Sequence, residues 1–273
     1  MKRIAILAML LLAGCSEPKT DAWLGYAEGE NAFIAAPQAG WVAQLAVQRG
    51  DHVKAGDLLF TLDDTNQAST RDQADAQIAL AQSQRVAAEA NLVLAQKQLA
   101  RQAGLMAASA GTKQNYDVAK ANYDSAIAQV GQIDAQIAQA RATLLGAAYQ
   151  LSQRDVVSRT TGEVQDVYFR TGEYAAAMTP VVSVLPPQNV YVRFFVPESQ
   201  FARVKLGQRV AISCDGCASG ITATVTFIAQ QEEFTPPVIY SIGSREKLVF
   251  KIEARAPHGL KLNPGQPVDV RPL

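Results

Sequence analysis

The sequence is poor in the residue types on which catalysis and nucleic-acid binding depend. Only 18% of its 273 residues are charged and 7% are aromatic, and it contains two histidines and three cysteines. The 25 lysines and arginines equal the 25 aspartates and glutamates, so no basic surface for a nucleic-acid partner is predicted. HExxH zinc motifs, Walker A loops and GxGxxG nucleotide-binding loops are missing from the sequence. We therefore predict a protein that is not an enzyme and that has no catalytic residues, no cofactor and no metal site.

Proline is absent from residues 65–178, although the chain contains 12 prolines. Because proline breaks helices, its absence allows long ones, and this stretch is rich in the helix formers alanine, glutamine and leucine. In a first arm, positions recur in steps of four and three, and only the arginine interrupts the apolar series: Ala74, Ile78, Ala81, Arg85, Ala88, Leu92, Ala95 and Leu99. A second arm keeps such a series unbroken: Tyr116, Ala119, Tyr123, Ala126, Val130, Ile133, Ile137, Ala140, Leu144, Ala147 and Leu151.

Both apolar stripes are too narrow for the face of a globular core, and both alternate large residues with alanine. These features are typical of a coiled-coil seam in which two helices lie close together. A short stretch with glycine, serine and threonine at 101–112 separates the arms, which makes them antiparallel. The sequence therefore predicts an α-helical coiled-coil hairpin over residues 65–156, with its tip at 101–112 and arms about 60 Å long.

Strand-like segments flank the predicted hairpin on both sides, and they repeat each other. A displacement of 122 residues aligns the segment that begins at Gly40 with the one that begins at Gly162, without a gap. The aligned pairs are Gly40 with Gly162, Val42 with Val164, Leu45 with Val167, Gly50 with Gly172, Asp51 with Glu173, Leu59 with Val181 and Leu62 with Val184. Such half-motifs predict one small β domain whose halves pair in space. The alternative is two unrelated β segments with similar turns.

A further group of strand-like segments lies between residues 188 and 273, with a short helix expected at 198–204. Five or six strands in so short a region suit a small β-barrel. Cys214 and Cys217 lie between two of these segments around an Asp-Gly turn signal, whereas a thioredoxin-type CxxC opens a helix. We interpret the two cysteines as a structural disulfide across a turn. Free thiols and a redox or metal site are the alternatives.

The first residues have the features of a targeting segment. Lys2 and Arg3 precede an apolar run over residues 4–13, which is far shorter than the roughly 20 residues that span a bilayer as a helix. The run ends in Leu-Ala-Gly-Cys15, which resembles the lipobox of bacterial lipoproteins. This resemblance implies a signal peptide over 1–14 and a lipidated tether over 15–24 that starts with an acylated Cys15. The alternative is an ordinary secretory signal with a chance cysteine. Ser16 follows in place of the aspartate common in inner-membrane lipoproteins, which leaves the anchoring membrane open, with the inner membrane favoured.

The order of the predicted parts resembles the HlyD-type membrane fusion proteins, the periplasmic adaptors of tripartite efflux and type I secretion systems. The two half-motifs look like the halves of a biotinyl/lipoyl domain. In true carrier domains a tight turn between the halves presents a modifiable lysine, but here the hairpin occupies that place and Lys54 lies inside the first half. The resemblance implies an elongated, multi-domain α+β fold. Its lipoyl-like β domain, with halves at 25–64 (including an N-terminal strand) and 157–187, is split by the hairpin and followed by a small β-barrel at 188–273.

The predicted tip carries a spaced triplet that is similar to one in adaptors of this family. Arg101 is followed by Leu105 four residues on and by Thr112 seven further on, with threonine in place of the family's serine. In the family, these residues dock onto a TolC-like outer-membrane channel. Arg101 offers fixed hydrogen-bond donors and Leu105 an apolar anchor. Thr112 is placed to cap the second helix, with Gly104 and Gly111 expected to let the backbone turn. The alternative is a solvated Arg101 and a Leu105 that merely closes the hairpin end.

Residues 232–254 resemble a segment of adaptors that serve ABC-type exporters, which favours an ABC transporter as the inner-membrane partner. Together, these resemblances imply a non-catalytic, lipid-anchored adaptor in the periplasm. It would link such an exporter to the outer-membrane channel and assemble into a ring, commonly a hexamer in the family. The alternative is a coiled-coil envelope scaffold lipoprotein that is not coupled to a transporter.

Overall fold

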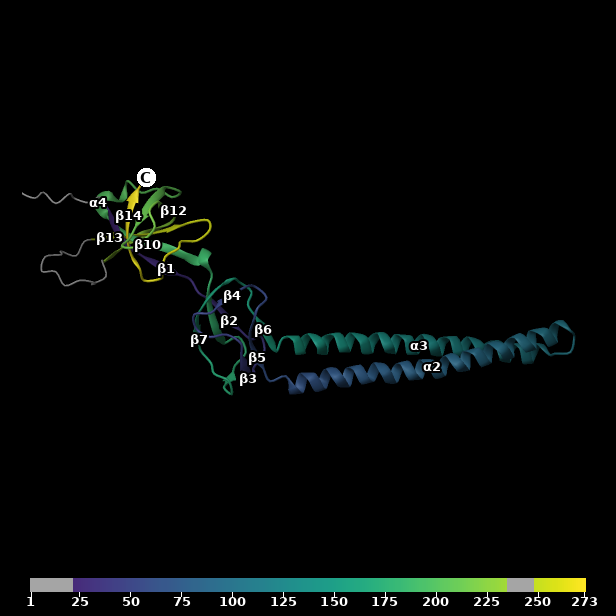
Figure 1. Cartoon of the computed structure of the whole chain (residues 1–273). Helices are drawn as coiled ribbons and strands as arrows, with labels where there is room; N and C mark the ends of the chain where they lie inside the picture. The colour runs from purple at the N-terminus through teal and green to yellow at the C-terminus, as the bar shows by residue number, and fades with distance from the viewer. Residues whose placement is uncertain (1–21, 235–247) are drawn as a thin grey trace, which may run out of the picture. The chain divides into compact units, whose positions relative to one another are not determined.

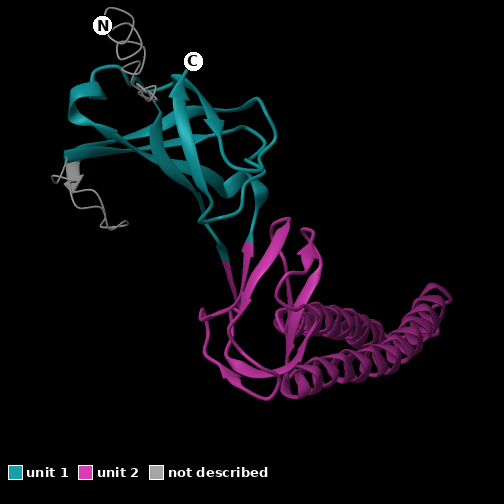
Figure 2. Cartoon of the chain, turned by 60° about the vertical axis from the view of Figure 1, so that its left-hand side comes forward, with its two compact units in different colours: residues 1–32, 185–273 teal, residues 33–184 magenta. Residues whose placement is uncertain are grey.

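The computed structural model describes residues 22–234 and 248–273. They form two compact units, coloured separately in Figure 2: residues up to Ala32 with Leu185–Leu273, and Phe33–Val184. The predicted signal peptide at 1–14 and Cys15 lie outside the described residues. No helix within the described ranges combines the length and the apolarity needed to cross a membrane.

The β part of the second unit consists of two four-stranded sheets. One sheet has the order β2-β9-β7-β4 and the other the order β6-β5-β3-β8. The strands before the hairpin are β2 (Ala32–Ala35), β3 (Gly40–Leu45), β4 (His52–Val53) and β5 (Leu58–Leu62), and those after it are β6 (Asp155–Val157), β7 (Gly162–Val167), β8 (Tyr174–Ala175) and β9 (Pro180–Leu185). Each sheet therefore draws strands from both sides of the hairpin, which confirms the prediction of one lipoyl-like domain built from two halves.

The aligned residues of the two halves occupy equivalent positions in this domain. Three aligned pairs of core residues are nearly or fully buried: Val42 and Val164, Leu59 and Val181, Leu62 and Val184. Gly50 N donates to Val164 O and Gly172 N donates to Val42 O, each at 2.8 Å. Gly50 and Gly172 also share a left-handed backbone, with φ of 92° and 88°, which glycine adopts without steric cost. The repeat in the sequence is thus a repeat in the geometry.

The hairpin consists of α2 (Thr65–Ala107) and α3 (Lys113–Ser152), which Figure 1 shows running side by side. Alanines and isoleucines of the predicted stripes form the buried seam, and the other apolar stripe positions are half-buried. The buried positions are Ala74, Ile78, Ala81, Ala88 and Ala95 on α2, with Ala119, Ile133, Ile137, Ala140 and Ala147 on α3. The coiled-coil prediction is therefore confirmed, with small residues that allow the two backbones to approach closely. The predicted end of the hairpin at 156 is corrected, because α3 ends at Ser152 and β6 (Asp155–Val157) already pairs in the β domain.

Arg85 interrupts the apolar stripe because it bridges the two helices. Its Nε lies 2.6 Å from Asp134 Oδ1 on α3, and its Nη1 lies 2.8 Å from Glu89 Oε1 one turn further along α2. The hydrogen bond to Asp134 is the main cause that raises the pKa of Arg85. All three side chains are substantially exposed, so this ion-pair cluster adds little stability but helps to fix the register of the arms.

The barrel of the first unit is closed and has the strand order β1-β10-β13-β12-β11-β14. Its strands are β1 (Trp23–Gly29), β10 (Val190–Pro197), β11 (Arg209–Ser213), β12 (Ile221–Phe234), β13 (Leu248–Arg255) and β14 (Pro267–Pro272), with a short 3-10 helix η1 (Pro187–Asn189) and helix α4 (Glu198–Phe201). The small barrel is as the sequence predicts, while α4 ends three residues earlier than the expected helix at 198–204.

The origin of the sixth strand corrects the sequence prediction. The tether expected over 15–24 ends earlier, because Trp23 already belongs to β1, and β1 joins the barrel instead of the lipoyl-like half at 25–64. Trp23 is buried and stacks on Phe194 with ring centroids 5.6 Å apart. Gly25 is required beside them, since a Cβ atom there would run into the backbone of β10. Alternation in the sequence predicts a strand but does not say which sheet that strand joins.

Candidate functional site

At the tip of the hairpin, predicted over 101–112, a five-residue connection, 108–112, joins α2 to α3, while residues 101–107 form the last turns of α2. Its backbone turns without Gly104, which lies inside α2, so the sequence prediction for this glycine is wrong. Ala108 N and Ala110 N bond back to Gly104 O and Leu105 O at 3.1 and 2.9 Å, which closes the helix end. The reversal occurs at Ser109, whose φ is 59°. Serine tolerates this left-handed position at a modest cost. Gly104 only lowers the helix propensity of α2 locally.

Gly111 and Thr112 shape the start of the second arm. A Cβ atom on Gly111 would lie 3.0 Å from Met106 N, so glycine lets the connection pack against the end of α2. Thr112 has an extended backbone, and its Oγ1 accepts a hydrogen bond from Asn115 N at 3.3 Å. The predicted cap is therefore confirmed. Because its hydroxyl oxygen is engaged in this bond, Thr112 serves the geometry of the tip first.

Arg101 and Leu105 stand one helical turn apart on the last turns of α2, where an i,i+4 pair shares one face. Arg101 is exposed, and its side chain makes no hydrogen bond or ion pair with any other residue that the structure describes. Leu105 and its neighbour Met106 are 39% and 42% exposed. The sequence prediction overlooked Met106, although a second large apolar residue in a polar turn is a signal in itself. The end of α2 thus presents the unpaired cation of Arg101 beside two partly exposed apolar side chains, a surface suited to binding a partner.

A groove with a volume of about 610 Å³ runs along one face of the hairpin between the arms. All the residues that line it are uncharged: Gln84, Ala87, Ala88, Asn91, Leu94, Ala95, Gln98, Asn122, Ser125, Ala126, Gln129 and Ile133. The carboxamides on α2 recur every seven residues, as do two on α3. A floor of alanines with a carboxamide rim suits the packing of another helix, and it offers no charged group for a small ionic ligand.

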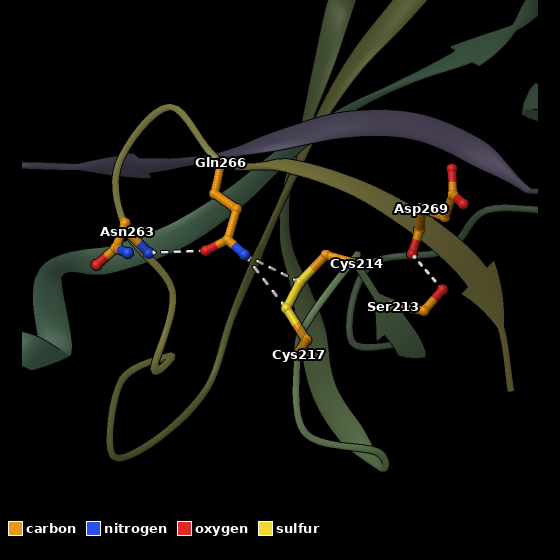
Figure 3. Close-up of a disulfide and its surroundings, with 6 residues drawn as sticks. All are labelled: Ser213, Cys214, Cys217, Asn263, Gln266 and Asp269. Carbon is orange, nitrogen blue, oxygen red and sulfur yellow. Dashed lines mark hydrogen bonds between the residues drawn. A yellow bond between two sulfur atoms is a disulfide. The ribbon is translucent and has the colours of Figure 1, made fainter.

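Figure 3 shows the disulfide between Cys214 and Cys217, whose Cα atoms are 5.3 Å apart. It spans the turn between β11 and β12, where Gly216 has a φ of 78°. Gln266 Nε2 donates to both sulfur atoms at 3.4 Å, and Gln266 Oε1 accepts from Asn263 N at 3.1 Å. The described residues contain no cluster of three or more His, Cys, Asp or Glu side chains that could hold a metal ion. This geometry supports the interpretation of a structural disulfide.

The outer face of the barrel carries an ion-pair cluster that the sequence did not reveal. Arg193 Nη1 lies 2.6 Å from Glu28 Oε2, and its Nη2 lies 2.9 Å from both Glu253 Oε1 and Tyr191 Oη. Burial, with a further contribution from Glu253, raises the pKa of Tyr191 to about 12, so its phenol stays protonated at neutral pH. Burial lowers the pKa of Arg193, but its hydrogen bonds and the nearby carboxylates outweigh this and raise it. The ion pairs of the cluster lie within three adjacent strands and have the character of a structural network, although Arg193 Nε is buried without a hydrogen-bond partner among the described residues.

Comparisons with known proteins agree with this architecture. Residues 77–154 match the family model described as "RND MFP, alpha-helical hairpin domain". The UPF0194 membrane protein in the asrC 5′ region of Acidithiobacillus ferridurans is 31% identical over 134 residues, which cover 48% of this chain and 39% of that protein. The chain therefore spans well under half of the length of this curated relative.

Two solved structures share the fold over almost the whole chain. The crystal structure of MacA from Actinobacillus actinomycetemcomitans superimposes with a TM-score of 0.69 at 21% identity, covering 92% of this chain and 77% of MacA. The structure of the periplasmic adaptor protein EmrA gives a TM-score of 0.53 at 13% identity, covering 93% of this chain and 99% of EmrA. At identities this low, the similarity shows a common fold and nothing more. The split β domain, the long hairpin and the barrel therefore occur together in other proteins of this architecture.

Proposed function

We propose that this chain, which has the fold of membrane fusion proteins and a hairpin that matches the RND type, acts as a non-catalytic periplasmic adaptor. In this role it joins an inner-membrane exporter to an outer-membrane channel. The observation that carries the proposal is the exposed end of a long two-helix arm, where Arg101 has no hydrogen-bond or ion-pair partner among the described residues and Leu105 is 39% exposed. An enzyme or carrier would need a group that reacts, and the tip offers only groups that bind.

Docking of the channel is assigned to Arg101, Leu105 and Thr112. Arg101 can donate to carbonyl or carboxylate oxygens at the helix ends of a partner, and Leu105 with Met106 can fill an apolar groove. Thr112 supports them by capping α3. The three residues therefore do not contribute equally to docking, because the hydroxyl oxygen of Thr112 already accepts the capping hydrogen bond.

The uncharged groove of the hairpin supports assembly of several copies into a ring, with a hexamer as the expected number. A lone two-helix arm leaves this groove and its alanine floor open, and a helix of a second copy would cover them. Arg85 and Asp134, which bridge the arms, do not line this groove, so the surface of the hairpin is not uniform around its axis. Unlike surfaces favour head-to-tail contacts, which form a ring when the rotation between copies closes.

The membrane attachment and the type of exporter are further parts of the proposal. Cys15 carries the lipid anchor, with the inner membrane favoured, and the sequence at 232–254 favours an ABC-type exporter. Replacement of Cys15 by serine should abolish metabolic labelling with palmitate and leave the protein unprocessed or soluble. Label retained on the Cys15→Ser protein would exclude this anchor.

Changes at the tip test the central proposal. Arg101→Ala removes a charged donor, typically worth about 1.5–3 kcal/mol in a hydrogen bond, and Leu105→Ser removes an apolar anchor worth about 2 kcal/mol or more. Each loss recurs at every tip of a ring, so we expect export to fall at least tenfold. Crosslinking of the channel from a cysteine placed at Ser109 should fall in parallel, while thermal unfolding stays unchanged because hairpin tips contribute little to a core.

Matched controls come from the same arms. Arg141→Ala removes an exposed arginine from α3, and Val86→Ser removes a side chain on α2 that is 66% exposed. Both should export and crosslink like the wild type. If the tip variants also behave like the wild type, the docking assignment is wrong. If the wild-type tip crosslinks to no channel at all, the scaffold alternative gains support.

A further inference from the structure

The hairpin joins the β domain through two junctions of two residues each. β5 ends at Leu62 and α2 begins at Thr65, while α3 ends at Ser152 and β6 begins at Asp155. Directly before β6 lies Arg154, whose backbone oxygen accepts a hydrogen bond from Leu62 N at 2.9 Å. This bond continues the pairing of β5 with β6, so the main chain of Arg154 helps to hold the two roots of the hairpin together.

The side chain of Arg154 extends this connection into the sheet. With 8% of its surface exposed, it is the most buried charged residue in the part of the chain that the structure describes. Its Nη1 donates to the backbone oxygen of Ala39 at 2.9 Å, and its Nε is buried without a hydrogen-bond partner among the described residues. A buried charge with an unsatisfied donor lowers stability, so stability alone does not account for an arginine at this position.

Gly40, the first residue of β3, makes room for the guanidinium. A Cβ atom at this position would lie 2.6 Å from Arg154 Nη1, far inside van der Waals contact. Gly40 is not among the glycines with positive φ, so its backbone conformation is open to other residues. The lack of a side chain at Gly40 therefore provides space for Arg154.

The charge of Arg154 also reaches the root of α2. Asp63 Oδ1 accepts hydrogen bonds from Thr65 N at 2.9 Å and from Thr65 Oγ1 at 2.7 Å. These bonds, together with the nearby charge of Arg154, lower the pKa of Asp63. Asp63 N donates in turn to Trp41 O in β3 at 2.9 Å. The guanidinium thus contacts the start of β3, and its charge acts on Asp63 beside the start of α2.

We propose that Arg154 is a positioning residue that fixes the direction of the hairpin relative to the lipoyl-like domain. Its main chain joins the two helix roots, and its side chain ties them to the start of β3 through Ala39 and Gly40. Without the guanidinium, the two junctions are joined to each other and to β3 through backbone hydrogen bonds, from Leu62 N to Arg154 O and from Asp63 N to Trp41 O, which permit small changes of angle. The assignment of a fixed direction stands on its own, and only its consequence for docking rests on the proposed function.

A small change of angle at the root becomes large at the tip. α2 contains 43 residues and is therefore about 64 Å long. A tilt of about 10° at its root would move the tip by about 11 Å, which is close to the full diameter of a helix. A tip that binds through two or three side chains needs far better placement than this.

Distances between spin labels test the direction of the hairpin directly. One label is placed on α2 at Val86, which is 66% exposed, and one on the β domain at Glu163, which is also exposed. Both labels are attached through unnatural amino acids in full-length protein, so the native cysteines stay in place. Arg154→Gln removes the charge, Arg154→Lys removes the second donor arm, and Gly40→Ala displaces the guanidinium without altering the hairpin. For each variant we expect the distance distribution between the labels to become at least twice as broad, with helix content unchanged.

The controls separate positioning from folding. Arg159→Gln removes an exposed arginine five residues further on and should leave the distribution unchanged. Because Gly40→Ala and Arg154→Gln act on the same contact, the double variant should be no broader than either single one. If Arg154→Gln fails to fold, Arg154→Lys and Gly40→Ala still decide. Distributions as narrow as the wild type in folded variants would overturn the proposal, and the measurement involves no transporter or channel, so failure of the proposed function would not imitate that result.

Discussion

Met178 occupies a backbone position that the other half of the repeat gives to glycine. Gly56 has a φ of 98° and Met178 a φ of 61°, and the two residues are separated by the same displacement as the aligned pairs of the repeat. Gly56 N donates to Ser158 O at 2.8 Å, while Met178 N donates to Ala36 O at 2.9 Å, so both turns close in the same way. Methionine, which carries a Cβ atom, therefore bears a steric strain that glycine avoids.

Replacing Met178 by glycine should stabilise the lipoyl-like domain. The left-handed conformation costs a non-glycine residue about 1–2 kcal/mol, and the extra freedom of glycine in the unfolded chain returns about 0.5–1 kcal/mol of this. Little packing is lost, because Met178 is 74% exposed. We expect the free energy of unfolding in urea to rise by about 0.5–1 kcal/mol.

The reverse change in the equivalent turn is the control. Gly56→Met introduces the same strain where nothing lies within 4 Å of the new Cβ atom, so it should lower the free energy of unfolding by a similar amount. A loss of stability in Met178→Gly would mean that the methionine side chain makes contacts that outweigh its backbone strain. The sequence could not predict this position, because a methionine in place of glycine hides the match between the two halves.

Among the helices and strands, the seam of the hairpin gives the clearest separation between core and surface. Ile137 is 6% exposed and packs in a cluster with Ala81, Ala88 and Ile133. Ile137→Asp removes apolar contacts worth about 2–5 kcal/mol and places an unpaired carboxylate in the seam. The thermal midpoint of the helical circular-dichroism signal should fall markedly, in a transition distinct from that of the β domain.

Ile127 on the same helix is the matched control, with 45% of its surface exposed. Ile127→Asp should change the stability of the hairpin by no more than about 0.5 kcal/mol, as surface substitutions usually do. If both variants melt like the wild type, the seam assignment is wrong. If Ile127→Asp melts earlier than the wild type, and does so only at high protein concentration, the exposed face of the helix contacts a second copy.

The seam was predictable from the sequence because its signal is periodic and local. The heptad steps from Ala74 to Leu99 depend only on neighbours in the same helix. The partner of Arg85 was not predictable, because Asp134 lies on the other arm and no local pattern links the two residues. The prediction of the turn at Gly104 was wrong for a related reason. Glycine is a typical turn residue, but hydrogen bonding and the packing of Gly111 place the reversal at Ser109.

At the scale of the whole molecule, the order of parts could be read from the sequence, while the membership of β1 could not. Repeats, proline gaps and heptads each mark a segment along the chain. Closure of the barrel by β1 brings together residues far apart in sequence, such as Tyr26 with Pro267 and Gly29 with Val190. Only the side-chain pattern of the finished barrel, with Trp23 and Ala27 buried, distinguishes that choice from a place in the lipoyl-like sheets.

The split domain should survive without its insertion. A variant in which a short turn replaces residues 74–151 keeps the apolar residues of both half-motifs: Val42, Leu59, Leu62, Val164, Val181 and Val184, all at most 2% exposed. Since these residues pack against one another and not against the helices, we expect cooperative unfolding with a single transition for this domain. Denaturation followed by near-ultraviolet circular dichroism measures it.

The same deletion combined with Val164→Asp serves as the control, because a buried carboxylate should abolish the transition. Gradual, non-cooperative unfolding of the deletion variant alone would show that the two halves need the hairpin to form one core. In the deletion variant, the side chain of Arg154 remains, but the intact helices that it orients are gone.

The insertion also determines the order of events in time. The sheets cannot close until Leu62 meets the chain about 90 residues later, and closing a flexible loop of that length costs about 4 kcal/mol in entropy. Contacts at the tip join residues only a few positions apart, so they form first, and each further pair along the seam shortens the remaining loop. Pairing of the two helices from the tip toward the root thus brings the second half of the β domain to the first. Changes near the tip that spare the native stability should therefore slow the refolding of sheets that lie tens of ångströms away.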